Sequence, residues 1–427
     1  MAWRLIDDVS RELWARVVIL GALAVVALGL AILVGPLLPE KISGYVSGQA
    51  ADRLLSIIAN AMLAVTTFSL TVMVTVYRNS STQFTPRLHR LIMQDPTTQN
   101  TLASFIGAYV FALIAIILRE LGVFSDDRAL VLFAMTVLVL AYVVFSLIRW
   151  VLHLQTFGSL MNATREIEDI TGRQFRERLD NPCLGANPWA EGVTVPDGAT
   201  AVRSEETGYI QRIYQESLQD KAAEYGRHVY LRVSPGSFVM KGDVLAQVCT
   251  SDTVELDEDA RDFADVLRAH FGVGDVRTYE QDPRFGLVVL GEIASKALSP
   301  GINDPGTAID VITRTSRILT LYRDETANDT EVAHDRLWIK PICPHDIIED
   351  AFSALARDGA GLVEVQQRLQ SSLARLIEQD DPEMRKAAVA AAGLFYRRAV
   401  QTFDFAPDAD RLKASTAQAV LDHIAAE

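Results

Sequence analysis

Long apolar runs dominate the first third of the chain. Four of them approach the roughly 20 residues that a helix needs to cross about 30 Å of hydrocarbon. These runs are residues 17–35, 54–76, 101–118 and 130–148, and none contains Asp, Glu, Lys, Arg or His. The pattern predicts a transmembrane domain of four helices over residues 17–155. In residues 1–16, apolar and charged positions alternate as in an amphipathic helix at the membrane interface.

The second apolar run carries a polar stripe. At 100° per residue, five polar side chains share a face about 100° wide. They are Ser56, Asn60, Thr67, Thr71 and Thr75. One interpretation is a helix that lines a water-filled path. The other is close helix packing, with the hydroxyls forming hydrogen bonds across the interface.

A polar, basic segment, residues 77–87, comes after the second run. We expect Pro86 to begin a short helix near its end. Three arginines belong to this region: Arg78, Arg87 and Arg90. They either meet lipid headgroups or form a cytoplasmic mouth that favours anions.

Beyond the spans, the pattern changes to short strands and helices. We predict a helical extension and linker over residues 156–195, a small β-rich module over 196–255 and a mainly helical domain over 256–427. Strands in the module are expected at residues 199–202, 208–213, 228–233, 238–239 and 244–248. The predicted fold class is thus a membrane α-helical domain followed by a cytoplasmic α+β region with C-terminal helices.

Two strings in the module are TGYIQRI at 207–213 and YLRVSPGSFVMKGDVLAQV at 230–248. Together they resemble half of a biotinyl/lipoyl-like hammerhead barrel. Carrier domains of that kind place a modified lysine just beyond this point, where this chain has no lysine in residues 248–252. We therefore expect the shape without a prosthetic group, and no cofactor.

The most unusual string is QDPRFGLVVLGEIASKALSPGINDPGTAI at residues 281–309. Residues 285–298 have helical periodicity, and Asn303 or Asp304 is suited to cap a second helix that has Pro305 in its first turn. One interpretation is two helices joined by a rigid connector. The other is a ligand site in which amides at the helix start hold an anion. Its candidate residues are Asp282, Arg284, Asn303, Asp304 and Thr307.

Several helices are expected around this string. An acidic helix near residues 256–271 is better explained as a solvated helical face than as a cation site. Residues 342–427 are expected to form three or four further helices, with Asp381 capping the one over 382–403. A terminal helix is expected over 411–426. Cys343 and His345 lack a second cluster to complete a zinc set, so no metal is predicted.

Charge divides the chain in the same place as hydropathy. Residues 1–155 hold 11 Lys and Arg against 9 Asp and Glu, a balance of +2, whereas the remainder holds 29 against 45, a balance of −16. Basic residues in the short flanks of the spans predict a multi-pass inner-membrane protein with both termini in the cytoplasm. The three scattered cysteines suit free thiols in a reducing compartment. An acidic domain without a basic stripe argues against nucleic acid as a partner.

The four spans, SSTQFTPR at 80–87, TGYIQRI at 207–213 and ALSPGINDPGTA at 297–308 resemble a family of uncharacterised bacterial membrane proteins, known only as a domain of unknown function. The resemblance covers most of the chain. It implies an inner-membrane protein without an assigned biochemical activity.

Common catalytic signatures are absent: the sequence has no GxxxxGK[ST], HExxH, GxSxG or GxGxxG. We predict a non-enzymatic homo-oligomer, embedded in lipid, that forms an ion- or solute-conducting path regulated by its cytoplasmic domain. The alternative is a non-conducting, membrane-anchored scaffold that recruits a cytoplasmic protein partner. An enzyme that uses the 282–307 region is the third hypothesis.

Overall fold

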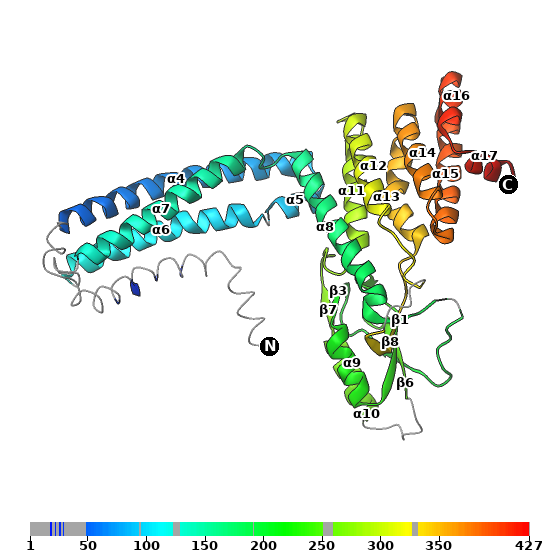
Figure 1. Ribbon diagram of the computed structural model, residues 1–427, viewed down its shortest axis with the longest axis horizontal. Coiled ribbons are helices and arrows are strands. Elements are labelled where there is room, and N and C mark those ends of the chain that lie inside the picture. Colours follow the sequence, from blue (N-terminus) through cyan, green and yellow to red (C-terminus); the bar gives the residue numbers. More distant parts are fainter. Residues whose placement is uncertain are drawn as a thin grey trace. The chain divides into compact units, whose positions relative to one another are not determined.

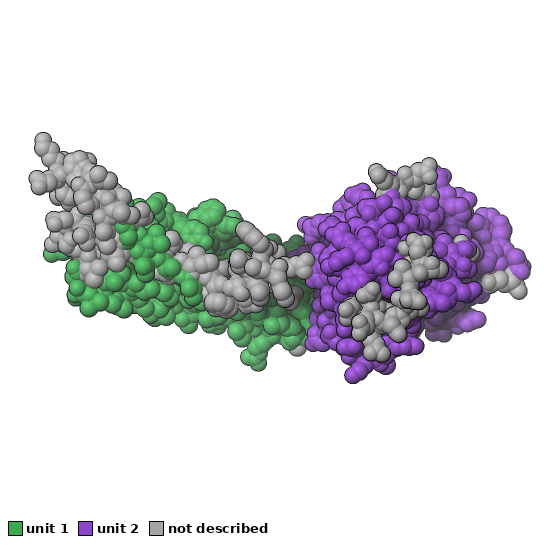
Figure 2. Space-filling model, turned by 90° about the horizontal axis from the view of Figure 1, so that it is seen from below, with its two compact units in different colours: residues 1–163 green, residues 164–427 purple. Residues whose placement is uncertain are grey.

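A computed structural model describes residues 48–93, 95–122, 129–190, 192–250, 259–326 and 332–426, together with five isolated helical positions at 18, 22, 25, 26 and 29. The chain divides into two compact units, residues 1–163 and 164–427, which Figure 2 colours separately. The predicted amphipathic helix over residues 1–16 lies outside the described residues. So does most of the predicted span over 17–35.

The first unit is a bundle of long apolar helices. Its described helices are α4 (Gly48–Gln83), α5 (Pro86–Met93), α6 (Pro96–Glu120) and α7 (Ala129–Leu154) (Figure 1). Among the described residues, three helices are long and apolar enough to cross a membrane: Gln49–Ser81, Pro86–Glu120 and Leu130–Leu154. They contain the second, third and fourth predicted spans.

The bundle core forms where α4 packs against α6 and α7. Leu55 and Ile58 of α4 are buried with Phe105 and Phe111 of α6 and Leu132 of α7. The polar segment after the second run, residues 77–87, does not form a separate loop. Instead, α4 continues to Gln83, because no proline or glycine interrupts it before Pro86 begins α5.

The second unit begins within helix α8 (Leu160–Asp180) and continues with the short 3₁₀ helix η3 (Pro182–Gly185) and two sheets. The five-stranded sheet has the order β1-β8-β4-β6-β2, and the three-stranded sheet has the order β5-β3-β7. The strand bounds are β1 Ala186–Pro188, β2 Thr200–Arg203, β3 Gly208–Ile213, β4 Arg227–Leu231, β5 Phe238–Val239, β6 Val244–Thr250, β7 Phe271–Gly274 and β8 His334–Ile339.

The sheets extend beyond the predicted module at 196–255. Strand β1 comes from the segment expected to be linker, and β7 and β8 come from the region expected to be helical. In addition, β8 pairs in parallel with both β1 and β4. All five strands expected within 196–255 are present, but a self-contained biotinyl/lipoyl-like module is not confirmed.

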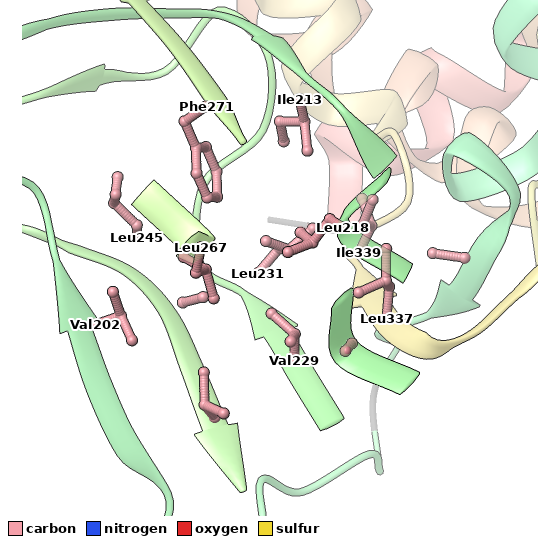
Figure 3. Close-up of a cluster of buried hydrophobic side chains, with 14 of the residues drawn as sticks. Val202, Ile213, Leu218, Val229, Leu231, Leu245, Leu267, Phe271, Leu337 and Ile339 are labelled. Atoms are coloured by element: carbon pink, nitrogen blue, oxygen red, sulfur yellow. The ribbon is translucent and has the colours of Figure 1, made fainter. Parts of the chain in front are cut away.

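Helices α9 (Gln215–Glu224) and α10 (Asp259–Ala269) contribute to one hydrophobic core with both sheets. Figure 3 shows Val229, Leu231 and Leu337 of the five-stranded sheet near Leu218 of α9 and Leu267 of α10. Burial alternates at the end of β3, where Ile213 is buried and its neighbour Arg212 is exposed. This alternation is typical of a sheet that has one face on the core and the other in solvent.

The remaining helices form a continuous stack, seen side by side in Figure 1. They are α11 Pro283–Ala297, α12 Pro305–Leu319, α13 Pro344–Asp358, α14 Val363–Ile377, α15 Pro382–Thr402, α16 Ala406–Ser415 and α17 Gln418–Ala426. Each of the first three begins with proline at its first position. The predicted single terminal helix is in fact two, because Thr416 is extended and its hydroxyl donates to Leu412 O at 2.9 Å.

Candidate functional site

The polar stripe of α4 lies on the side of that helix that faces away from α6 and α7. Its five residues, Ser56, Asn60, Thr67, Thr71 and Thr75, are all exposed. The buried residues of α4, among them Leu55, Ile58 and Met62, occupy the opposite side of the helix, where α6 and α7 pack. Packing within the described bundle therefore does not account for the stripe.

The three threonine hydroxyls form hydrogen bonds within α4. Thr67 donates to Leu63 O at 2.9 Å, Thr71 to Thr67 O at 2.9 Å and Thr75 to Thr71 O at 2.8 Å. Each hydroxyl thereby uses its hydrogen and keeps lone pairs on the exposed oxygen. The stripe consequently presents acceptors to whatever lies beside it.

Asn60 is the most polar member of the stripe. Among the described residues, its amide forms no hydrogen bond. An amide left unpaired in hydrocarbon is unfavourable by several kcal/mol. This side chain therefore requires water, a permeating species or a second protein surface.

Arginines stand at both ends of the stripe. At 100° per residue, Arg53 and Arg78 fall on the same face as Asn60, and both are exposed. They are about 37 Å apart along the helix axis, compared with about 30 Å of hydrocarbon. The stretch of α4 between the two arginines is therefore longer than the hydrocarbon layer is thick.

The other two predicted mouth residues are on α5, with Arg90 exposed and Arg87 partly buried. The contact between the Ser80 hydroxyl and His89 Nδ1 (2.7 Å) holds α5 against the end of α4. Arg78, Arg87 and Arg90 thus belong to one helical corner rather than to a loop.

The predicted ligand residues separate into two groups. Asp282 and Asp304 cap α11 and α12, and the 15 residues of α11 lie between them, which corresponds to about 22 Å. The structure therefore does not bring Asn303, Asp304 and Thr307 together with Asp282 and Arg284.

The Asp304 group forms a helix cap. Its carboxylate accepts from Thr307 N at 3.0 Å and from the Thr307 hydroxyl at 2.6 Å, contacts that lower the pKa of the Asp304 carboxyl. Asn303 has a left-handed backbone (φ 50°), which turns the chain into α12. Its amide N–H donates to Ser299 O at 2.8 Å. These contacts explain the GINDP string as a connector between helices.

The Asp282 group lies in a dense network of ions. Asp282 accepts from Arg277 at 2.6 and 3.0 Å and from Phe285 N at 3.1 Å. Arg284 donates to Asp350 at 2.6 Å and to Asp346 at 2.7 Å, both on α13. Burial raises the pKa of the Asp282 carboxyl, and the contacts with Arg277 oppose that rise.

These residues border a cavity of about 490 Å³, which we call the cationic cavity. Its walls come from the end of α8, the turn between β4 and β5, the start of α11 and the segment between β8 and α13. Five lining side chains are cationic: Arg178, Arg232, Arg277, Arg284 and Lys340. Only Asp282 and Asp346 are lining carboxylates, in a region whose overall balance is −16.

Gly236 closes one wall of the cavity. It has a left-handed backbone (φ 89°), and a Cβ there would overlap the Asp282 carboxylate and lie 2.9 Å from Arg277 Nε. The turn between β4 and β5 can therefore approach the ion pair only with glycine at this position.

Of the cavity residues, the sequence identified Asp282 and Arg284 but not Arg178, Arg232, Arg277 or Lys340. Four separate segments supply the missing cations, and no local spacing relates them. The sequence offers one indirect signal. Acidic residues outnumber basic ones in residues 156–427, so a place where five cations gather stands out in this region. Among the described residues, no group of three or more His, Cys, Asp or Glu side chains is arranged to hold a metal ion.

Comparisons with known proteins place this molecule among uncharacterised relatives. Residues 10–375 match a family described as "Predicted membrane protein (DUF2254)". Uncharacterised proteins of Mycobacterium bovis (Mb1321c) and Mycobacterium tuberculosis (Rv1290c) are each 27% identical over 272 residues, which cover 63% of this chain and 51% of theirs. The matched region is thus about half the length of these relatives. No solved structure matches the chain.

Proposed function

The chain belongs to the DUF2254 family of predicted membrane proteins, and on that premise we propose that its spans form an ion- or solute-conducting path regulated by the second unit. The observation that carries the proposal is the outward position of the polar stripe on α4. Ser56, Asn60 and the three threonines are exposed on the face that α6 and α7 leave uncovered.

We propose that a path on this face forms between several copies of the chain, because α6 and α7 pack on the other side of α4. The stripe faces away from the described helices of its own bundle, so copies of α4 arranged around a shared axis would enclose it. Closed cyclic assemblies are the common form of homo-oligomer. Enclosure would also give the Asn60 amide water or a permeating species in place of lipid.

The chemistry of the stripe favours particular cargo. Its threonine oxygens are acceptors, because their hydrogens are donated to backbone carbonyls. Acceptor oxygens suit cations and uncharged solutes that carry hydrogen-bond donors. Arg53 and Arg78 at its ends suit anions, so selectivity would depend on which zone limits the flux.

We place the protein in a bacterial inner membrane, with lipid around the bundle and both termini in the cytoplasm. The support is the distribution of basic residues near the spans. The acidic α+β unit would then lie in the cytoplasm.

Reconstituted liposomes provide the direct test. We expect protein-dependent release of a small ion, strongly reduced in Thr67→Leu/Thr71→Leu, because leucine removes the acceptor and adds bulk. Val144→Leu adds bulk at an exposed position of α7 outside the stripe and should leave the flux unchanged. Silent liposomes made with a well-folded oligomer would reject the proposal.

Crosslinking tests the assembly independently. In a background with the three natural cysteines replaced by serine, Ser56→Cys should form intermolecular crosslinks in the membrane. The matched Val144→Cys should not. Crosslinking at both positions, or at neither, would argue against a shared axis lined by α4.

A specific observation supports the scaffold alternative as well. Phe238 on β5 and Met240 beside it are 51% and 60% exposed, which offers an apolar contact for a cytoplasmic protein. The fragment for a pull-down should begin at residue 164, where the second unit starts, because most of α8 and the whole of β1 belong to that unit. One stoichiometric partner, lost in Phe238→Ser/Met240→Ser, together with silent liposomes, would favour this function.

A further inference from the structure

We propose that the cationic cavity of the second unit binds a small molecule that carries phosphate groups. The inference uses only residues of that unit and does not depend on conduction by the spans. Four features of the cavity lead to it: unpaired cations, spare guanidinium donors, helix starts and size.

Two of the cations that line the cavity have no acidic partner. Arg232 and Lys340 form no ion pair with a carboxylate of the described residues. Arg232 donates to Gln247 Oε1 at 2.7 Å, and its guanidinium lies 4.8 Å from the centre of the Trp189 ring. Lys340 Nζ lies 5.8 Å from the same ring. The Trp189 ring thus interacts with two cationic side chains that have no carboxylate partner among the described residues, and both of them line the cavity.

The paired arginines keep donors in reserve. Arg277 uses two nitrogens on Asp282, and Arg284 uses one on Asp346 and one on Asp350. A guanidinium has five N–H groups, so each pair leaves some unused. If Glu325 and Asp350 are included as partners of the lining arginines, five cations still face only four carboxylates.

Two helix starts border the same space. Asp282 at α11 and Cys343 at α13 are the N-cap residues, and both line the cavity. Asp282 caps α11, whereas Cys343 gives α13 no side-chain cap. Amides in the first turn of α13 therefore add to the positive potential of the site. Ser234 and Ser237 add two hydroxyls.

This composition selects the ligand class. Donors greatly outnumber free acceptors, because Asp282 and Asp346 are occupied by Arg277 and Arg284. A phosphate group offers several charged oxygens at once and forms strong hydrogen bonds with guanidinium groups. The volume of about 490 Å³ falls in the range of small-molecule sites.

Calorimetry on the full chain in neutral detergent tests the proposal, with pyrophosphate as the probe. We expect binding by the unmodified protein and a loss of affinity of about tenfold or more in Arg232→Gln/Lys340→Gln. Both side chains are exposed, so the variant should fold normally. Arg368→Gln/Arg375→Gln removes the same charge from exposed positions of α14 and should bind like the unmodified protein.

Two results would overturn the proposal. One is no binding of pyrophosphate at millimolar concentration by a folded protein. The other is equal weakening in both double variants, which would reveal a general charge effect in place of a site. Thermal unfolding of each variant establishes that it is folded.

A comparison of two lipid compositions distinguishes a lipid headgroup from a soluble phosphate compound as the natural ligand. The protein is placed in nanodiscs of phosphatidylcholine alone or with phosphatidic acid. If a lipid headgroup is the natural ligand, phosphatidic acid will compete and weaken pyrophosphate binding by the unmodified protein. If the ligand is soluble, the two nanodiscs will give the same affinity. Either result is consistent with phosphate recognition.

Discussion

Arg178 and Glu325 form an ion pair in which both side chains are buried, although 147 residues separate them in the chain. The Glu325 carboxylate also accepts from Cys183 N at 2.9 Å and from Ile342 N at 2.6 Å. Arg178 also donates to Lys340 O at 3.2 Å. The pair thus joins α8, η3, the segment after α12 and the segment after β8.

Removing one member of this pair should destabilise the second unit strongly. Glu325→Gln leaves the Arg178 charge buried without a counter-charge. This should lower the free energy of unfolding by about 3–5 kcal/mol. For a unit of this size, we expect a fall of the midpoint on the order of 10 °C in thermal unfolding. Glu378→Gln, at an exposed position, is the control and should stay within about 0.5 kcal/mol. A similar midpoint in both variants would contradict the structural role of the pair.

The Asp304 cap of α12 predicts that the stability of the folded state depends on pH. The Thr307 contacts lower the pKa of Asp304, so its ionised form stabilises the folded state above the unfolded pKa. That contribution is lost as the pH falls through the folded pKa, below 3.8. Asp304→Ala should lower the free energy of unfolding by about 0.5–2 kcal/mol at pH 7.

Chemical denaturation measures this difference at a series of pH values. The gap between the unmodified protein and Asp304→Ala should narrow in acid. Asp380→Ala, an exposed carboxylate outside a cap, controls for charge. A gap that is independent of pH would show that the carboxylate charge does not contribute.

Gly236 tests the wall of the cationic cavity. Gly236→Ala combines an unfavourable left-handed backbone, about 1–2 kcal/mol, with overlap of the Asp282 carboxylate. Gly242→Ala is the matched control, since Gly242 has φ 99° and no atom within 4 Å of its would-be Cβ. We expect Gly236→Ala to be the more destabilising by chemical denaturation. Equal losses would mean that the Arg277–Asp282 pair moves aside freely.

The cysteines should differ sharply in reactivity. Burial and the neighbouring Glu325 raise the pKa of the Cys183 thiol to about 12, which leaves almost no thiolate at pH 8. Cys343 is exposed and lines the cationic cavity. With iodoacetamide and peptide mass spectrometry, we expect rapid labelling of Cys343 and labelling of Cys183 only after unfolding. Fast native labelling of Cys183 would contradict its burial.

Sequence periodicity predicted the helices well because their signals are local. The spans after the first, the strands predicted at 208–213 and 244–248 and the helix starts at Asp304 and Asp381 all follow from residues close together in the sequence. Caps are equally local: Asp381 accepts from Met384 N, three residues away, at 2.7 Å.

Pairing between distant segments was not predictable in this way. Strands β1 and β7 have three and four residues, too few for an alternating pattern to stand out. The cationic cavity could not be predicted either. Its residues Arg178, Arg232, Arg277 and Lys340 are far apart in the sequence and come together only through tertiary packing. The polar stripe of α4 could be recognised in the sequence. The sequence did not indicate whether neighbouring helices of the bundle cover it.

The position of β8 has a consequence for biosynthesis. It lies between β1 and β4, yet its residues 334–339 are made long after theirs. At ribosomal speeds, the wait after β1 is on the order of ten seconds. Until β8 emerges, β4 can pair only with β6, and its other edge is open to pairing with other chains. We expect truncation before residue 334 to yield an aggregation-prone product, and nascent chains of this protein to need a chaperone until β8 emerges.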